Sequence, residues 1–592
     1  MKPRNYLRST AWAALAAAGF GAGAAIAFVS EGSSEPAATL RALSASGLGV
    51  GHCLIAAAAA AMTPDEAMKA YENAVPPLWK DLGTLSYKVS TKSPEAQSYF
   101  DQGFRLSANF NHAEARRAFR KAQNLDPTCA MCFLGEALVL GPNINAPMDP
   151  AANAPALAAL KKAQELAAGA TQKEQDIIAA VATRYSEDPA ADRHALDNAF
   201  ADATAALSDK YPDDLDLATL AAEAAMDTQP WDYWQPGGKE GKGREADIQK
   251  RLEAVLAKDP NHASAIHLYI HLVEASDRPE RAESYADHLA ALMPGAGHIV
   301  HMPSHIYYRV GRYGDSLDAN EAASKIDESY IAATGAVGLY PLGYYSHNVH
   351  FVLVSAQLLG DSRIVLEQAD KLDKVLSNEA ADKFPIVQPV KSAPYFAWAQ
   401  YGDPDKVLAM AEPAGAPPYV TAMWHYARGE AFAAKKDAAG ARTEADAIAR
   451  IAKETDWSAL DLWAVPARPV LEVAQNIVLA RAAQAENKAD DEIGLWKKAA
   501  EAQDTIPYTE PPYWYYPVRQ SLGSALLRAG HPEEAEKEFL AALDRARGSA
   551  WALFGLEQAE KAKGDTAAAD KAAAEFSKAW RGDPSMLTLE RL

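Results

Sequence analysis

The chain has 592 residues, more than one hydrophobic core usually supports, so several domains or a repeat array are expected. Hydrophobic residues make up 49% of it and charged residues 23%, a globular balance that argues against wholesale disorder. The formal net charge of −20 repels phosphate backbones and therefore disfavours nucleic acid as a partner.

The first residues have the layout of an export signal. An uncharged run rich in alanine and glycine follows three basic residues, Lys2, Arg4 and Arg8. Residues 25–27 offer a small-x-small cleavage site, and the run up to Val29 is also long enough to span a bilayer as an uncleaved anchor. We therefore expect residues 1–29 to be a signal peptide or membrane anchor and residues 30–62 a flexible leader. The protein is then exported, either periplasmic or anchored facing the periplasm, and meets the membrane only through this segment.

Residues 99–127 match the spacing of one helix-turn-helix repeat unit. Small and aromatic residues recur there at Tyr99, Gly103, Ala115, Phe119, Ala122 and Pro127. The two small residues Gly103 and Ala115 let two antiparallel helices touch, while the aromatic rings fill the space between them. Pro127 ends the second helix because it lacks the next N–H donor. The segment therefore resembles the tetratricopeptide-repeat family at nearly every consensus position.

The same phase recurs further along the chain, at Ala282, Leu289, Pro294, Gly311, Tyr313, Ala323, Gly360, Gly429, Ala441, Gly523, Ala535, Phe539 and Ala542. No period-two strand pattern with hairpin turns is found. The resemblance implies an all-α fold, a right-handed α-solenoid of tetratricopeptide-like helix pairs. Three aromatic-rich inserts, expected to pack against the solenoid, interrupt it at residues 229–243, 334–346 and 505–516. We expect an N-terminal helical region, central units with a histidine-rich groove, and C-terminal units with capping helices, at 63–210, 211–375 and 376–592.

Histidine is concentrated in the central units, where eight of the chain's 14 histidines lie between residues 267 and 350. In the tetratricopeptide family, the first helix of each unit lines the concave groove. The resemblance places nine chelating residues on that face: His267, His271, His298, His301, His305, His347, His350, Glu223 and Asp227. We expect these side chains to form a metal site.

The spacing of these histidines favours metal binding. Four pairs lie three or four residues apart and so share a helix face: His267/His271, His301/His305, His298/His301 and His347/His350. Imidazole and carboxylate ligands suit zinc, copper or iron. Pro303 interrupts this run, and a helix that begins near it would leave His298 and His301 on the preceding turn.

Cys129 and Cys132 form a CxxC pair at the start of a helix. Three cysteines cannot build a disulfide framework, and the βαβ context of a thioredoxin motif is missing. The pair is either a local structural disulfide, which an exported protein favours, or a redox pair. We expect the remaining histidines to be structural, as for His288 and His425, or to lie on the surface and in turns, as for His112, His194, His262 and His531.

The motifs GPNIN, HLYIH, HMPSHI and YYSHNVHF, together with CxxC, resemble a group of bacterial exported tetratricopeptide-repeat proteins. This resemblance implies the fold and the histidine motifs but no activity. We expect an exported solenoid whose groove binds a transition metal, because peptide-clamping arrays normally place Lys, Arg and Asn where histidines stand here. The first alternative is a scaffold that binds a protein or peptide in the groove. The second is a metalloenzyme that uses Glu223 or Asp227 as acid or base.

Overall fold

The computed structural model describes residues 63–592. The chain divides into two compact units, Met1–Ile55 and Ala56–Leu592, and every described residue belongs to the second. The predicted signal or anchor and the leader lie outside the described residues. Within residues 63–592, no helix is both long enough and apolar enough to cross a membrane.

The described residues form helices joined by loops and short turns, as predicted. The first stretch contains α3 (Pro64–Asn73), α4 (Pro94–Ala108), α5 (His112–Leu125), α6 (Ala130–Val139), α7 (Asn153–Leu166), α8 (Gln172–Ala182), α9 (Arg193–Lys210) and α10 (Leu215–Met226). The central stretch contains α11 (Glu245–Lys258), α12 (Ala263–Val273), α13 (Glu283–Leu292), α14 (Gly297–His301), α15 (Pro303–Val310), α16 (Tyr313–Thr334), the π-helix η4 (Tyr340–Tyr345), α17 (Ser346–Leu359) and α18 (Ser362–Val375). The last contains α19 (Asn378–Lys383), α20 (Gln388–Tyr401), α21 (Pro404–Ala409), α22 (Pro418–Ala434), α23 (Ala438–Glu454), α24 (Ser458–Asp461), α25 (Ala467–Ala485), α26 (Ala489–Asp504), α27 (Val518–Arg528), α28 (Pro532–Arg545), α29 (Ala550–Lys563) and α30 (Thr566–Ala579).

Helix pairs pack around a phenylalanine that two glycines accommodate. Phe119 on α5 lies between Gly103 on α4 and Gly135 on α6, where an added Cβ would come within 2.7 and 2.5 Å of the ring. Only glycine permits so close an approach of helix backbone to an aromatic ring. The same arrangement recurs near the C-terminus, where Phe539 meets Gly523 and Gly555. The repeat predicted from these small and aromatic residues is therefore confirmed at both ends.

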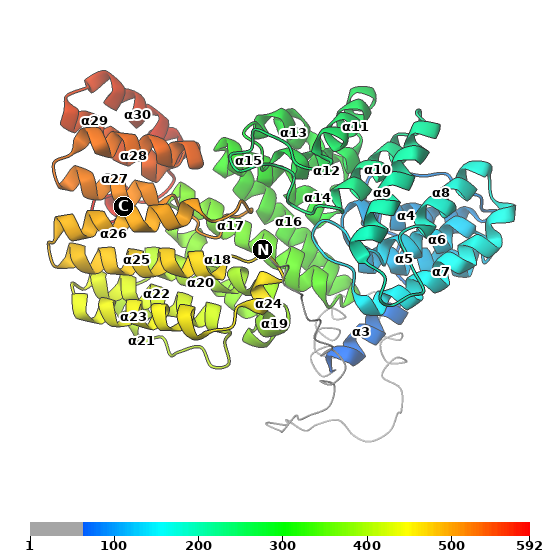
Figure 1. The fold of residues 1–592 in the computed structure, drawn as a ribbon, viewed down its shortest axis with the longest axis horizontal. Coiled ribbons are helices and arrows are strands. Elements are labelled where there is room, and N and C mark those ends of the chain that lie inside the picture. The colour runs from blue at the N-terminus through cyan, green and yellow to red at the C-terminus, as the bar shows by residue number, and fades with distance from the viewer. Residues whose placement is uncertain (1–62) are drawn as a thin grey trace, which may run out of the picture. The chain divides into compact units, whose positions relative to one another are not determined.

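Successive pairs stack into an α-solenoid. Figure 1 shows the long helices α22, α23, α25 and α26 lying side by side, each against its neighbour. Among residues 63–592, β-structure is limited to two isolated bridges, Asn143 with Ala146 and Trp234 with Gly241. The predicted all-α class is confirmed.

Buried apolar side chains form two large clusters along the solenoid. The first runs from Tyr71 to Tyr344 and the second from Tyr308 to Leu592. Helices α14 to α17 lie where the two clusters meet in the sequence, and they carry most of the predicted metal ligands. The divisions expected after residues 210 and 375 stay predictions.

Candidate metal centre

Six of the seven predicted histidine ligands form two groups of three. In each group, one ring nitrogen from every member lies within 4.8 Å of the others. We name the groups triad A, which is His267, His271 and His298, and triad B, which is His301, His305 and His347. The triads are neighbours, because the ring centroids of His271 and His305 lie 5.5 Å apart and those of His298 and His301 lie 5.7 Å apart.

Four short helical segments position these rings. His267 and His271 lie one turn apart on α12, and His347 lies on α17. Helix α14 ends at His301 and α15 begins at Pro303, so the break predicted at this proline is present. The pair His298/His301, expected to share a helix face, is divided between the triads. Residues three apart on a helix point about 60° apart, and here a different helix meets each ring.

The hydrogen bonds of triad B fix which ring nitrogen carries the proton. His305 Nδ1 lies 2.7 Å from Glu274 Oε2, and His301 Nδ1 lies 2.6 Å from Asn320 Oδ1. Asn320 Nδ2 donates to the Ser316 carbonyl at 2.7 Å, which leaves its Oδ1 facing the histidine. Both Nδ1 atoms therefore donate, and in the neutral rings, the form that binds metal, both Nε2 atoms carry lone pairs. These two Nε2 atoms face each other at 2.8 Å.

Triad A follows the same pattern. His267 Nδ1 donates to the Ala108 carbonyl at 2.8 Å, and His271 Nδ1 donates to Glu274 Oε1 at 2.9 Å. The Nε2 atom of His271 is buried and has no hydrogen-bond partner among the described residues. His298 Nε2 lies 3.1 Å from His267 Nε2, which leaves at least two Nε2 lone pairs pointing inward in this triad as well.

Burial favours the neutral form of His267, His271, His298, His301 and His347. His267, His271, His298, His301 and His305 are at most 2% exposed, and His347 is half-buried. Desolvation lowers the pKa of His267, His298, His301 and His347 well below its ordinary value, and the neighbouring histidines lower it further. Neutral imidazole is the form that binds metal ions.

Glu274 joins the two triads and was not predicted from the sequence. It is fully buried and accepts a hydrogen bond from one histidine of each triad. Burial alone would raise its pKa, but the interactions with His305 and His271 more than offset this effect and lower the pKa to about 2. The only sequence signal is its position three residues after His271, directly after the end of α12. Asn320 had no comparable signal.

All three aromatic inserts reach this site. Trp231 packs edge-on against His271 with centroids 5.1 Å apart, and Tyr344 against His298 at 4.9 Å. In the third insert, the hydroxyl of Tyr508 lies 3.0 Å from Glu274 Oε2. The inserts thus pack on the solenoid as expected. They also bury the histidines, which we had expected to line an open groove.

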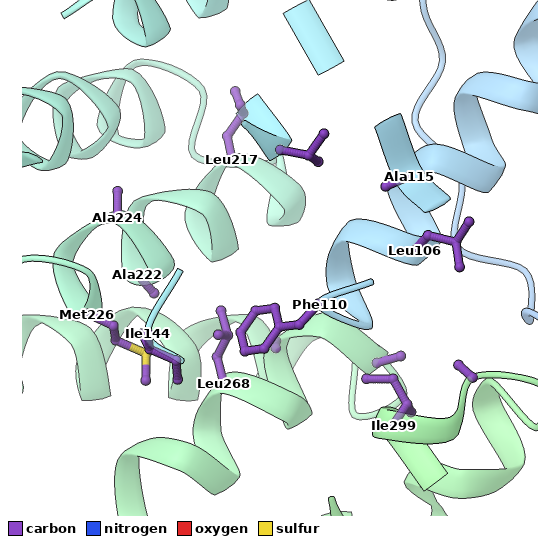
Figure 2. Close-up of a cluster of buried hydrophobic side chains, with 14 of the residues drawn as sticks. Leu106, Phe110, Ala115, Ile144, Leu217, Ala222, Ala224, Met226, Leu268 and Ile299 are labelled. Carbon is purple, nitrogen blue, oxygen red and sulfur yellow. The ribbon is translucent and has the colours of Figure 1, made fainter. Parts of the chain in front are cut away.

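One phenylalanine backs each triad. Phe110 follows α4, and its ring points toward Leu268 (Figure 2). Its ring centroid lies 4.5 Å from that of His267 and 5.4 Å from that of His298. Phe351 on α17 lies 5.0 to 5.1 Å from all three rings of triad B. These apolar walls exclude water from the imidazoles.

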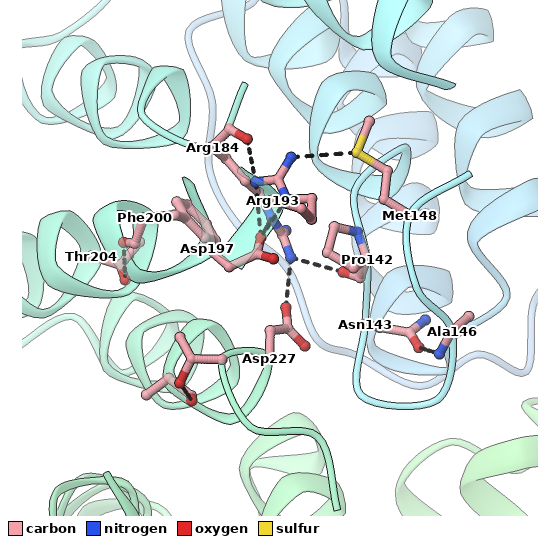
Figure 3. Close-up of polar contacts among 12 residues, drawn as sticks. Pro142, Asn143, Ala146, Met148, Arg184, Arg193, Asp197, Phe200, Thr204 and Asp227 are labelled. Atoms are coloured by element: carbon pink, nitrogen blue, oxygen red, sulfur yellow. Dashed lines mark hydrogen bonds and ion pairs between the residues drawn. The ribbon is translucent and has the colours of Figure 1, made fainter. Parts of the chain in front are cut away.

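Three predicted ligands are not brought together with the triads. His350 Nε2 instead lies 2.8 Å from the hydroxyl of Tyr515. Glu223 and Asp227 belong to no group of three potential ligand atoms in the described part of the chain. Asp227 follows the last residue of α10, and its carboxylate pairs with the buried Arg184 at 2.6 Å (Figure 3). A buried guanidinium requires a counter-charge, and that requirement decides where this carboxylate points.

Other sequence expectations have mixed outcomes. Cys129 and Cys132 form a disulfide at the start of α6. His262, expected on the surface or in a turn, lies in the turn before α12 and is buried there, where it caps α12 by accepting from the backbone N–H of Ala265 and contacts Asp216. His112, for which the same was expected, is the partly buried first residue of α5 and lines a cavity that opens to solvent.

Comparisons with known proteins add little. No protein-family model and no curated protein match the sequence. Among solved structures, the human IFIT1 dimer with m7Gppp-AAAA is 11% identical, with 88% of this chain and 95% of that chain covered and a TM-score of 0.32. Yeast Tom70 is 12% identical, with 90% of this chain and 97% of the Tom70 chain covered and a TM-score of 0.26. A chain of the APC/C hetero-tetramer Cut9–Hcn1 is 10% identical, with 78% of this chain and 76% of that chain covered and a TM-score of 0.29. The fold assignment therefore rests on the helix pairs described above.

Proposed function

We propose that the protein binds two transition-metal ions, one in each histidine triad. The observation that carries this proposal is the 2.8 Å approach of His301 Nε2 to His305 Nε2. In the neutral rings both atoms carry lone pairs, since both Nδ1 atoms donate to oxygen. Two facing lone pairs repel each other in a buried, low-dielectric environment, and a cation between them converts that repulsion into coordination.

The observed spacing suits first-row metals. Two imidazole nitrogens on one tetrahedral zinc ion lie about 3.3 Å apart, given a Zn–N distance of about 2.0–2.1 Å. The two close Nε2 contacts, at 2.8 and 3.1 Å, require the rings to separate by only a few tenths of an ångström. Sets of three imidazoles suit zinc, copper or iron.

Two ions are proposed rather than one because each triad has its own orienting contacts. Glu274 holds one ring of each triad, and the other Nδ1 donors use Ala108 in triad A and Asn320 in triad B. Hydrogen bonds of this kind fix the tautomer and ring orientation of metal-binding histidines. The carboxylate between the triads also offsets part of the charge of two neighbouring cations.

Three protein ligands leave one coordination position open in a tetrahedral ion, which is the arrangement of catalytic rather than structural zinc sites. This observation favours a metalloenzyme as the second candidate function. The solenoid of helix pairs also supports a protein-binding scaffold, since such folds present extended binding surfaces. We place either function in the cell envelope, and the Cys129–Cys132 disulfide supports an oxidising compartment.

Elemental analysis tests the proposal. Protein loaded with zinc and then dialysed is expected to hold two ions per chain, and His267→Ala and His301→Ala one each. The double variant is expected to hold none. His350→Ala is the matched control, because His350 is equally buried but belongs to neither triad, and it should retain two. Wild-type protein without bound metal, or the same metal content in all variants, would refute the proposal.

A further inference from the structure

Glu510 is a buried acid that the proposed metal centre does not use. It belongs to the third aromatic insert and is 6% exposed, and its Oε1 lies 3.0 Å from the hydroxyl of Tyr508. The same hydroxyl lies 3.0 Å from Glu274 Oε2, which also accepts from His305 Nδ1 at 2.7 Å. A chain of three hydrogen bonds therefore links Glu510 to triad B.

The single hydroxyl proton of Tyr508 cannot serve both carboxyl groups. Burial raises the pKa of Tyr508 well above its ordinary value, so the phenol keeps this proton. Glu274 is ionised, because it accepts from two histidines at once, and a charged acceptor is the stronger one. Tyr508 therefore donates to Glu274. Its contact with Glu510 is then a hydrogen bond only if Glu510 carries a proton and donates to the hydroxyl oxygen.

The charges around Glu510 also favour its protonated form. Arg309 is the cation that faces it. The guanidinium lies 5.3 Å from the ring centroid of Tyr508 and donates to two backbone carbonyls, those of Glu274 and Ser276. One guanidinium balances the carboxylate of Glu274 and leaves none for a second carboxylate. Burial is the main reason that the pKa of Glu510 rises to about 8; Arg309 opposes this rise and Glu274 adds to it.

The other ionisable groups near Glu510 supply neither charge nor a second hydrogen bond. Burial raises the pKa of Tyr308 and Tyr313, so both phenols stay neutral. Glu510 Oε2 is buried without a hydrogen-bond partner among residues 63–592. Leaving this oxygen unpaired costs more free energy when the carboxyl group is charged than when it is neutral. The surroundings therefore stabilise the protonated acid until a further positive charge arrives.

We propose that Glu510 releases its proton when an ion binds in triad B and so balances part of the charge of that ion. The O–H bond of the carboxyl group breaks, the proton passes to solvent, and the electron pair stays on Glu510 as a negative charge. This inference rests on the proposed metal binding and adds a pH dependence to it. Because binding releases a proton, metal affinity rises with pH until Glu510 is already ionised in the metal-free protein.

Calorimetric titration of metal-free protein with zinc chloride tests the inference. Titrations near neutral pH in two buffers of different ionisation enthalpy give the number of protons released per chain. We expect the wild type to release about one proton more than Glu510→Gln, a variant of the same shape without the acidic proton. Both proteins are expected to bind two zinc ions, since the triads are intact in both.

The matched control is Glu430→Gln. Burial also raises the pKa of Glu430, but this acid pairs with Arg481 on α25 at 3.4 Å. We expect this variant to release as many protons as the wild type. Circular dichroism verifies that each variant is folded. Infrared difference spectra give a second measurement on the wild type alone, in which zinc is expected to remove the carbonyl band of one protonated carboxylic acid.

The outcomes separate this inference from the metal site itself. Equal proton release by the wild type and Glu510→Gln, with zinc bound to both, would overturn the inference and leave the metal site standing. Greater release by the variant would overturn it as well, because Glu510 would then take up a proton. An infrared band that zinc leaves unchanged has the same meaning. Wild-type protein that binds no zinc would refute both proposals.

Discussion

Replacing Glu274 with glutamine is expected to weaken one triad and spare the other. The carboxylate accepts from two histidines at once, one on each oxygen. A glutamine amide has the same shape but only one acceptor oxygen, and its nitrogen is a donor. One of the two histidines must therefore lose its acceptor.

The surroundings of Glu274 decide which histidine that is. Oε2 faces two donors, His305 Nδ1 at 2.7 Å and the Tyr508 hydroxyl at 3.0 Å, whereas Oε1 faces only His271 at 2.9 Å. The amide oxygen is therefore expected at the Oε2 position and the NH₂ group beside His271. His271 then moves its proton to Nε2, the atom that faces the centre of triad A, and can no longer bind metal through it.

The size of the expected loss in metal affinity follows from other proteins in which a residue hydrogen-bonds to a metal-binding histidine. Loss of a hydrogen bond that orients a ligand histidine weakens metal binding about 10- to 100-fold, or about 1.4–2.7 kcal/mol. We expect this loss in triad A and a change of less than about threefold in triad B.

Two background variants separate the triads. His301→Ala leaves only triad A intact, and His267→Ala leaves only triad B. Zinc affinity is measured by competition with a chromophoric chelator, with and without Glu274→Gln in each background. Equal losses in both backgrounds, or a loss confined to triad B, would refute the tautomer argument.

The remaining predictions concern stability. Gly135→Ala is expected to lower the free energy of unfolding by about 1–3 kcal/mol, because its Cβ would meet the Phe119 ring at 2.5 Å. Gly494→Ala on α26 should instead raise the free energy of unfolding by up to about 1 kcal/mol, because the new Cβ meets nothing within 4 Å beyond the adjacent backbone of its own helix. Urea unfolding measures both changes. Burial raises the pKa of Asp327 from 3.8 to about 7, so the folded state binds its proton more tightly than the unfolded state does. As the pH rises from 4 to 7, metal-free wild-type protein is therefore expected to lose stability relative to the Asp327→Asn variant, by at most about 4 kcal/mol. A stability difference between the two proteins that does not change with pH would contradict this.

The fold was predictable because its signals are local. Glycine and phenylalanine recur at the spacing that lets one helix pair close, and the close contacts of Phe119 with Gly103 and Gly135 show the physical reason. The histidine positions followed from the same register, and six of those seven side chains do meet. The break at Pro303 was also readable, since proline at the first position of a helix needs no donor.

The composition of the site was less predictable because it depends on contacts between distant segments. Phe110, Tyr344 and Tyr508 reach the triads from three different regions, and no spacing rule relates them to the histidines. The register placed Asp227 among the ligands, but it contained no information that Arg184 would be buried beside it.

Metal binding and apolar packing are linked in this arrangement. Phe110 belongs to the first apolar cluster and packs on triad A, whereas Phe351 belongs to the second and packs on triad B. Helix α14 supplies one ligand to each triad within five residues. An ion that binds only this native arrangement stabilises it by mass action, so metal in either triad opposes local unfolding of α14. Packing thus brings together imidazoles whose facing lone pairs repel, and the proposed ions turn that repulsion into a bond between α12, α14, α15 and α17.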